Sequence, residues 1–200
     1  MRYGKGHREE TRRHIIDVAA RRFREDGVAA AGIAGLMADA GLTNGAFYTH
    51  FTSKEDLVRQ ALQAVQENTQ GTTVQALKDG APPEVWLRRY LSPQHRDNPG
   101  AGCVAAALSA EIARHPEETR DIFRAGYEKF VGLIAATLPI GTPAERRAKA
   151  QALYGLMIGT LQLARAVGKG PESDEILDNG VKAGLVFISS VPELRCVTAP

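Results

Sequence analysis

The sequence predicts an all-α protein of about nine helices, and two observations support that prediction. Apolar residues recur at helical rather than alternating spacing in almost every segment, as at Ile15, Ala19 and Phe23. Glycine and proline then interrupt these segments where helices are expected to end. The helices predicted in this way cover residues 11–26, 33–40, 44–51, 55–69, 84–91, 102–114, 116–138, 143–167 and 173–190.

The charged residues are distributed unevenly along the chain. Residues 1–54 hold nine Lys and Arg against six Asp and Glu, a net charge of +3. The remainder holds 16 basic and 17 acidic residues, a net charge of −1, so the +2 of the whole chain belongs to its N-terminal quarter. A basic segment on a near-neutral body favours a polyanion as the partner of one end only.

Two short helices around a glycine-containing turn predict a helix-turn-helix motif at about residues 31–50. Gly41 lies in the turn, and Thr43 precedes the second short helix, where its side chain is expected to accept a backbone N–H bond. Helices paired in this way within a basic segment are typical of proteins that enter the major groove of DNA. We therefore expect residues 1–54 to form a DNA-binding domain.

The second short helix has the composition that a major-groove helix requires. Phe47 and Phe51 are four residues apart and can anchor it to a core, while its other residues are small or polar. Ser53 is expected to cap the helix that follows. The predicted DNA contacts are Asn44, Gly45, Ala46 and Thr49 at base edges, and Tyr48, His50, Lys54 and the capping Thr43 around them.

The stretch from Thr11 to Leu57 resembles the DNA-binding domain of the TetR, or tetracycline-repressor, family. Its most telling part is Gly45-Ala46-Phe47-Tyr48-Thr49-His50-Phe51-Thr52-Ser53-Lys54, which fits the family pattern Gly-x-x-Tyr-x-His-Phe-x-x-Lys. The resemblance is detailed over about residues 8–60. It implies a homodimer that binds a palindromic operator in double-stranded DNA, usually as a repressor, and a helical second domain that binds a small-molecule effector.

The sequence departs from the family pattern around the first helix of the motif. Family members usually carry Ser or Thr at its start and often Asp where Gly35 stands, whereas this chain reads Ala31-Gly32-Ile33-Ala34-Gly35. A missing hydroxyl cap costs about 0.5–2 kcal/mol. We therefore expect this helix to be soft in the free protein.

Residues 55–200 are expected to form the effector-binding and dimerisation domain. The helices predicted at 143–167 and 173–190 each contain two glycines four residues apart, although glycine inside a helix costs about 0.5–1 kcal/mol. Such pairs predict close approach of backbones, either within the chain or between two copies. With the dimer mode that the resemblance implies, the predicted interface comprises Ala152, Gly155, Gly159, Gly180 and Gly184.

An effector pocket needs apolar walls and a few polar groups. Trp86 and Tyr127 are the preferred candidates, because each joins a large apolar body to a polar tip. Any of the candidates is alternatively a plain core residue. The candidate pocket residues are Trp86, Tyr90, Cys103, Phe123, Tyr127, Phe130, Tyr154, Met157 and Leu161.

Cys103 opens the helix predicted at 102–114 and allows two interpretations. It is either a small buried apolar residue or a thiol activated at a helix N-terminus. The resemblance adds that some regulators of this type sense oxidants or electrophiles with a cysteine in a similar place. Cys103 and Cys196 provide no disulfide framework, which favours a reducing cytoplasm.

Other classes of function have little support in the sequence. We find no Gly-x-Ser-x-Gly motif, phosphate-binding loop or dinucleotide fingerprint, and the five histidines lack metal-ligand spacing. No apolar run approaches the roughly 18 residues of a membrane span. We therefore expect no catalysis, cofactor, metal or membrane partner. The alternatives are an architectural DNA-binding protein that senses nothing or, less favoured, an all-α enzyme.

Overall fold

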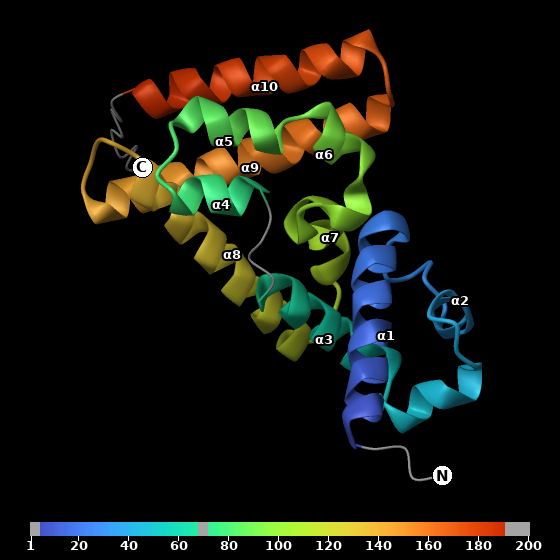
Figure 1. The fold of residues 1–200 in the computed structure, drawn as a ribbon. Coiled ribbons are helices and arrows are strands. Elements are labelled where there is room, and N and C mark those ends of the chain that lie inside the picture. The colour runs from blue at the N-terminus through green and yellow to red at the C-terminus, as the bar shows by residue number, and fades with distance from the viewer. Residues whose placement is uncertain (1–4, 68–71, 191–200) are drawn as a thin grey trace, which may run out of the picture. The chain divides into compact units, whose positions relative to one another are not determined.

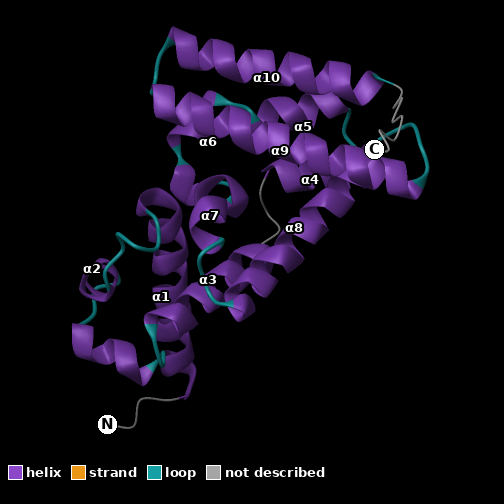
Figure 2. Ribbon diagram, turned by 180° about the vertical axis from the view of Figure 1, so that it is seen from behind, coloured by secondary structure: helices purple, strands orange, loops and turns teal. Residues whose placement is uncertain are grey.

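The computed structural model describes residues 5–67 and 72–190, and within those ranges the chain is all helical, as predicted (Figures 1 and 2). The described residues form ten α-helices and two short 3₁₀ helices, and they include no strand. In chain order these are α1 (Lys5–Asp26), α2 (Ile33–Asp39), η1 (Asn44–Thr49), α3 (Lys54–Glu67), α4 (Thr72–Lys78), α5 (Pro83–Tyr90), α6 (Pro93–Asp97), η2 (Pro99–Ala101), α7 (Val104–Ile112), α8 (Glu117–Thr137), α9 (Pro143–Val167) and α10 (Pro171–Ser189), where η marks a 3₁₀ helix.

Two of the α-helices, α4 and α6, were not expected from the sequence. Helix α4 has seven residues and begins with two threonines beside Gly71, a composition that indicates a turn. Helix α6 has only five residues and begins at Pro93. In α4 the turn-forming residues at the start outweighed the few apolar ones, and α6 is too short for an apolar period to repeat.

The chain packs into two compact units. Unit 1 comprises Met1–Gly71 with Pro93–Glu128, and unit 2 comprises Thr72–Ser92 with Lys129–Pro200. Unit 1 extends beyond the predicted domain 1–54 because α3, η2 and α7 all pack against α1. The division by packing thus differs from the sequence-based division into 1–54 and 55–200.

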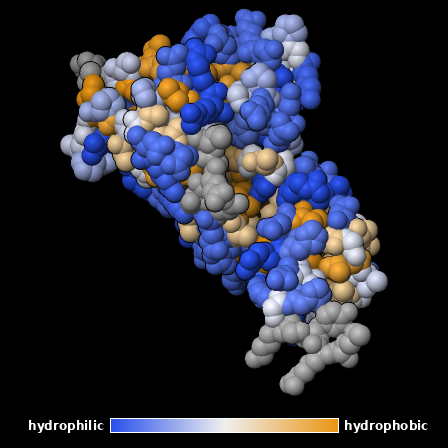
Figure 3. Space-filling model, in the orientation of Figure 1, coloured by the Kyte–Doolittle hydropathy of each residue, from blue (hydrophilic) through white to orange (hydrophobic). Residues whose placement is uncertain are grey.

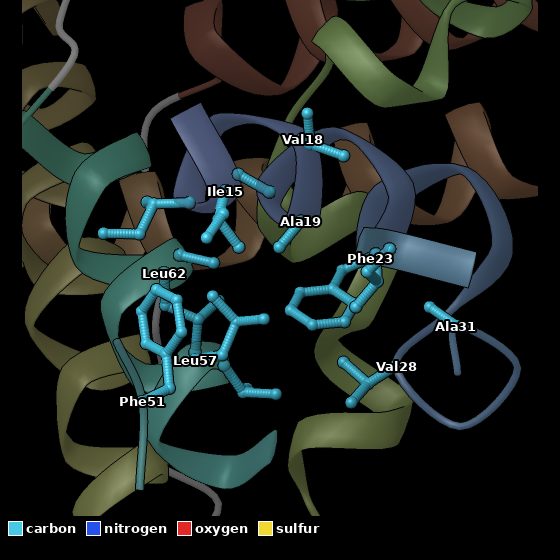
Figure 4. Packing of buried hydrophobic residues seen from close by; sticks show 14 of the residues in the cluster. Ile15, Val18, Ala19, Phe23, Val28, Ala31, Phe51, Leu57 and Leu62 are labelled. Carbon is cyan, nitrogen blue, oxygen red and sulfur yellow. The ribbon is translucent and has the colours of Figure 1, made fainter. Parts of the chain in front are cut away.

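The core of unit 1 is built on the apolar stripe of α1. Ile15, Ala19 and Phe23 are buried and point toward the side chains of Phe51 and Leu57 (Figure 4). Burying a large apolar side chain contributes about 1.5–3 kcal/mol, so this stripe fixes where α1 and α3 meet. Helix α1 then ends at a glycine in the left-handed conformation, Gly27, with φ of +86°, as predicted.

Unit 2 is organised around α9 and α10, which pack along each other, and α5, which packs on α4 and α10. Helix α9 begins with a complete capping box, in which Thr142 Oγ1 accepts from the Glu145 N–H and the Glu145 carboxylate accepts from the Thr142 N–H. The Lys149 ammonium is buried and donates to the carbonyls of Ile188 and Ser190, so its charge is compensated inside the unit.

Polar residues dominate the face of the molecule drawn in Figure 3, with smaller apolar areas among them. No helix in the described ranges is both long and apolar enough to cross a membrane. The same ranges contain no group of three or more His, Cys, Asp or Glu side chains placed to hold a metal ion.

Candidate nucleic-acid interface

The predicted recognition segment is anchored as its sequence suggested. Phe47 is fully buried and Phe51 nearly so, and their ring centroids lie 5.5 Å apart. Tyr48 lies between them in sequence and points outward, with 68% of its surface exposed. We define the η1 face as the exposed residues around it: Thr43, Asn44, Gly45, Tyr48 and Thr49.

The segment is a 3₁₀ helix rather than the expected α-helix, and the cap predicted at its start is absent. The Thr43 side chain makes no capping hydrogen bond, and the Ala46 N–H donates instead to the main-chain carbonyl of Thr43, at 3.0 Å. The Thr49 hydroxyl donates to the Ala46 carbonyl at 2.7 Å, another local bond. The predicted side-chain cap at Thr43 was therefore wrong: Thr43 stands at the N-cap, but its main-chain carbonyl and not its hydroxyl accepts the bond there.

The start of α3 is capped as predicted. Ser53 Oγ accepts from the Asp56 N–H at 3.1 Å, and the Asp56 carboxylate accepts from the Thr52 N–H at 3.0 Å. Burial alone would raise the pKa of Asp56, but the hydrogen bonds from Gln60 and Thr52 outweigh burial and lower it. These bonds fix the chain where it leaves the η1 face.

Helix α2 begins without a side-chain cap. Gly32 stands at its N-cap and provides no hydroxyl, and a Cβ on Gly35 would meet no other described part of the chain within 4 Å. Leu36 and Met37 are its buried anchors. The softness of α2 stays a prediction.

Two arginines of α1 that the sequence analysis did not select lie at the C-terminal end of η1. The Arg8 guanidinium donates to the Thr49 carbonyl at 2.6 Å, and the Arg12 guanidinium lies 5.7 Å from the centre of the Phe51 ring. Their spacing of four residues was visible in the sequence, but such a pair on an exposed helix face is common. They add positive charge beside the predicted phosphate contacts.

His50 is half-buried next to these arginines. Burial lowers its pKa from the ordinary 6.5, and the charges of Arg8 and Arg12 lower it further. Its Nδ1 atom is buried, and no described residue forms a hydrogen bond with it. The imidazole is therefore held neutral near pH 7 in the free protein.

Lys54 does not extend freely from the start of α3. Its ammonium donates to the main-chain carbonyl of Val28, in the loop between α1 and α2. An ammonium has three N–H donors, so this bond also leaves donors for another acceptor. The structure thus gives Lys54 an anchoring contact that the sequence did not predict.

Comparison with known proteins assigns this segment to a family. Residues 15–61 match the family model described as bacterial regulatory proteins, tetR family. Residues 15–61 thus form a segment of the tetR family of bacterial regulatory proteins.

Two curated relatives of the tetR-type chain are transcriptional regulators by name. The HTH-type transcriptional repressor DhaR of Mycobacterium sp. (strain GP1) is 28% identical over 125 residues, which are 62% of this chain and 63% of the relative. The HTH-type transcriptional regulator AcrR of Shigella flexneri is 40% identical over 60 residues, 30% of this chain and 28% of the relative. The matches thus span less than two thirds of either relative.

Among solved structures, the reduced form of NemR from E. coli has a similar fold, with a TM-score of 0.71 at 23% identity. That match covers 88% of this chain and 95% of NemR, so the tetR-type fold continues well beyond the matched N-terminal segment.

The candidate pocket residues fall into both units. The structure brings together Tyr90, Phe130 and Tyr154 in unit 2, with ring centroids of Phe130 and Tyr154 4.6 Å apart. Trp86 is fully buried one turn before Tyr90, and among the described residues no group accepts a hydrogen bond from its Nε1 atom. Met157 and Leu161 are buried in the same unit, whereas Cys103, Phe123 and Tyr127 belong to unit 1.

Cys103 occupies the N-cap position of α7 and is half-buried. Its backbone N–H donates to His95 Nε2 at 3.0 Å, and its side chain makes no capping bond. Its position at the helix start agrees with the sequence analysis. The choice between a packing role and a sensing role stays a prediction.

The two glycine pairs of unit 2 have different surroundings. A Cβ on Gly155 or Gly159 would meet no other described part of the chain within 4 Å, whereas one on Gly180 would lie 2.4 Å from Thr160 Cγ2. One on Gly184 would lie 3.2–3.4 Å from methyl groups of its own chain. Gly180 and Gly184 thus have an intrachain reason to lack side chains.

Gly155 and Gly159 belong to an apolar stripe on the outer side of α9. Its members recur every three or four residues, and all are exposed except Leu156, which is half-buried. Leu163 and Val167 expose 62% and 48% of their surfaces. We define the α9 stripe as Ala148, Ala152, Gly155, Leu156, Gly159, Leu163, Ala166 and Val167.

Proposed function

We propose that this tetR-family chain is a homodimeric transcriptional regulator that binds a palindromic operator and is released from it by a small molecule. The observation that carries the proposal is the η1 face. Two buried phenylalanines hold a short helix whose outward residues are polar or small, which is the surface that enters a major groove. Repression is the mode that the name of the mycobacterial relative supports.

In this proposal the residues in and next to η1 contact two different parts of the DNA. Asn44, Gly45, Ala46 and Thr49 contact base edges, whereas Thr43, Tyr48, His50 and Lys54 contact the phosphate backbone. Arg8 and Arg12 add positive charge at the same end of the motif. Since phosphate contacts release counterions, affinity falls steeply as salt rises.

The dimer forms through the α9 stripe. An exposed apolar stripe of this length on a helix favours burial against another protein surface. Ala152, Gly155 and Gly159 let a second helix approach closely, while Gly180 and Gly184 act indirectly by letting α10 pack closely within its own unit. The dimer then presents two η1 faces, one for each half of a palindrome.

The effector binds in unit 2 at the aromatic cluster of Trp86, Tyr90, Phe130 and Tyr154. A buried N–H without an acceptor costs free energy, so Trp86 Nε1 favours a ligand that carries a hydrogen-bond acceptor. The effector acts only through its different affinities for the DNA-binding and DNA-free states, so DNA must weaken effector binding by the same factor. In this proposal the chain acts in the cytoplasm and without catalysis.

Selection from random duplexes with the purified full-length chain tests the proposed function. We expect a palindromic sequence to be enriched, and we expect Asn44→Ala to relax its specificity at one position of each half-site by about 1–3 kcal/mol. Lys78→Ala, which removes an exposed cation outside unit 1, serves as the control and should bind as the wild type does. Enrichment of no sequence, with equal affinity for every duplex, would favour the architectural alternative.

A further inference from the structure

The loop between α1 and α2 is held by side chains from two other helices. This loop leads into the helix-turn-helix motif, so its position determines where α2 begins. Glu111 of α7 accepts hydrogen bonds from the main-chain N–H groups of Val28, at 2.9 Å, and Ala29, at 2.5 Å. On the other side of the same residue, the Lys54 ammonium donates to the Val28 carbonyl. Val28 is buried, so its backbone is fixed from both directions.

The backbone conformation of the loop directs two N–H groups toward one carboxylate. Gly27 has φ of +86°, and the N–H groups that follow it converge on the two oxygens of Glu111. Consecutive backbone N–H groups after a left-handed residue are typical of anion-binding nests. A Cβ on Gly27 would lie 3.0 Å from Glu111 Oε2, so the carboxylate also requires a glycine at this position.

A second contact joins the same two regions of unit 1. Arg24, in the last turn of α1, donates from its guanidinium to the carbonyl of Gly100 in η2, the short helix just before α7. The end of α1 and the start of the loop are thus bonded to both ends of the segment 100–111. Each of these bonds ends on a backbone group, so it fixes the path of the chain and not merely a side chain.

We propose that Glu111 is a positioning residue for DNA binding, through which α7 sets the placement of the helix-turn-helix motif. The proposal rests on the proposed function. Glu111 lies on α7, outside the segment that matches the family model, and its carboxylate accepts two hydrogen bonds from the loop before α2. Displacement of α7 would withdraw the carboxylate and remove two of the hydrogen bonds to the loop, while the bond from Lys54 would stay. Because α2 has no side-chain cap of its own, the bonds to this loop act together with the buried anchors Leu36 and Met37 to place its first turn.

Glu111→Gln tests the proposal, because glutamine keeps the size of the side chain but leaves one acceptor oxygen for two N–H groups. We expect amide exchange at Val28 or Ala29, followed by NMR, to become at least about tenfold faster. Affinity for the duplex selected by the wild-type protein should fall by about 2- to 30-fold. The slope of log affinity against log salt should not change, because Glu111 touches no phosphate.

Glu118→Gln is the matched control, since it removes the same charge from an exposed position in the first turn of α8. It should keep wild-type values in all three measurements. Faster exchange with unchanged duplex affinity would overturn the proposal, and so would a changed salt slope. If the wild type selects no duplex, the proposed function fails, and the exchange data alone decide whether Glu111 holds the loop.

Glu111→Asp provides a second variant if Glu111→Gln does not fold. It keeps the charge and draws the carboxylate back by one methylene, so the same three results are expected. If neither variant folds, Glu111 serves folding itself, and the positioning role is wrong.

Discussion

The η1 face and the α9 stripe are both the outer sides of helices with buried anchors, yet their chemistry is opposite. Tyr48 stands among polar residues on the η1 face, with Arg8 and His50 beside it. The α9 stripe consists only of Ala, Gly, Leu and Val. The first suits a highly charged, hydrated partner and the second an apolar one. We therefore expect salt to affect the two proposed interfaces in opposite ways.

The largest expected effect comes from placing a charge in the α9 stripe. Leu163→Glu would bury an unpaired carboxylate in the proposed dimer, which costs several kcal/mol, so the dimer should dissociate at least about 100-fold more readily. Affinity for the selected palindrome should fall with it, because each chain then binds a single half-site. Sedimentation measures the first effect and a duplex titration the second. Gln151→Glu adds the same charge outside the stripe and should change neither, whereas an intact dimer in Leu163→Glu would contradict the proposed interface.

The two glycine pairs provide a comparison within unit 2, with effects of opposite sign. In the monomeric Leu163→Glu background, Gly180→Ala should lower the free energy of unfolding by about 1–3 kcal/mol, since the new Cβ would overlap Thr160. Gly155→Ala should raise it by about 0.5–1 kcal/mol, because its surroundings are open. Denaturant titration gives both values. Equal effects would mean that the two positions do not differ as described.

Lys54 joins the charge of the η1 face to the loop at Val28. Lys54→Ala should weaken binding to every duplex and reduce the slope of log affinity against log salt by about 0.9, the value for one lost phosphate contact. The same substitution removes the bond to the Val28 carbonyl. Weaker binding with an unchanged slope would assign Lys54 to positioning alone.

The smallest expected effect is a dependence of stability on pH. His50 has a lowered pKa in the folded chain and titrates near 6.5 when unfolded, so the unfolded state takes up protons first as the pH falls. The stability that neutral His50 contributes is therefore complete above about pH 6.5 and is lost as the pH falls below that value. His50→Gln should lose less stability than the wild type between pH 7 and pH 5.5 in denaturant titrations. Identical losses would show that His50 does not titrate as described.

Features with a local sequence pattern were predicted well. The stripe of Ile15, Ala19 and Phe23, the buried pair Phe47 and Phe51, and the Ser53 cap all follow from spacing over a few residues, and all were confirmed. Helix α1 begins at Lys5, whereas the sequence predicted a start at residue 11. The first turns were missed because they are polar and carry no apolar period.

Features that depend on distant residues could not be predicted. Glu111 and Arg24 bind backbone groups 76 to 83 residues away. Because nearly every residue has the same backbone N–H and carbonyl, the sequence does not indicate which of them a side chain will bind. The glycine pairs show the same limit. Their spacing of four residues is identical, and only the packed helices distinguish the open positions of Gly155 and Gly159 from the filled surroundings of Gly180 and Gly184.

Hydroxyl-radical footprinting on the selected duplex most directly tests the claim that a dimer reads a palindrome, because it detects the DNA that both η1 faces protect in one experiment. A regulator with one recognition segment per chain should protect two patches on one side of the duplex. Their centres should lie about 10–10.5 base pairs apart, or a multiple of that distance. Protection that is uniform along the duplex, or confined to a single patch, would contradict a dimer that reads a palindrome.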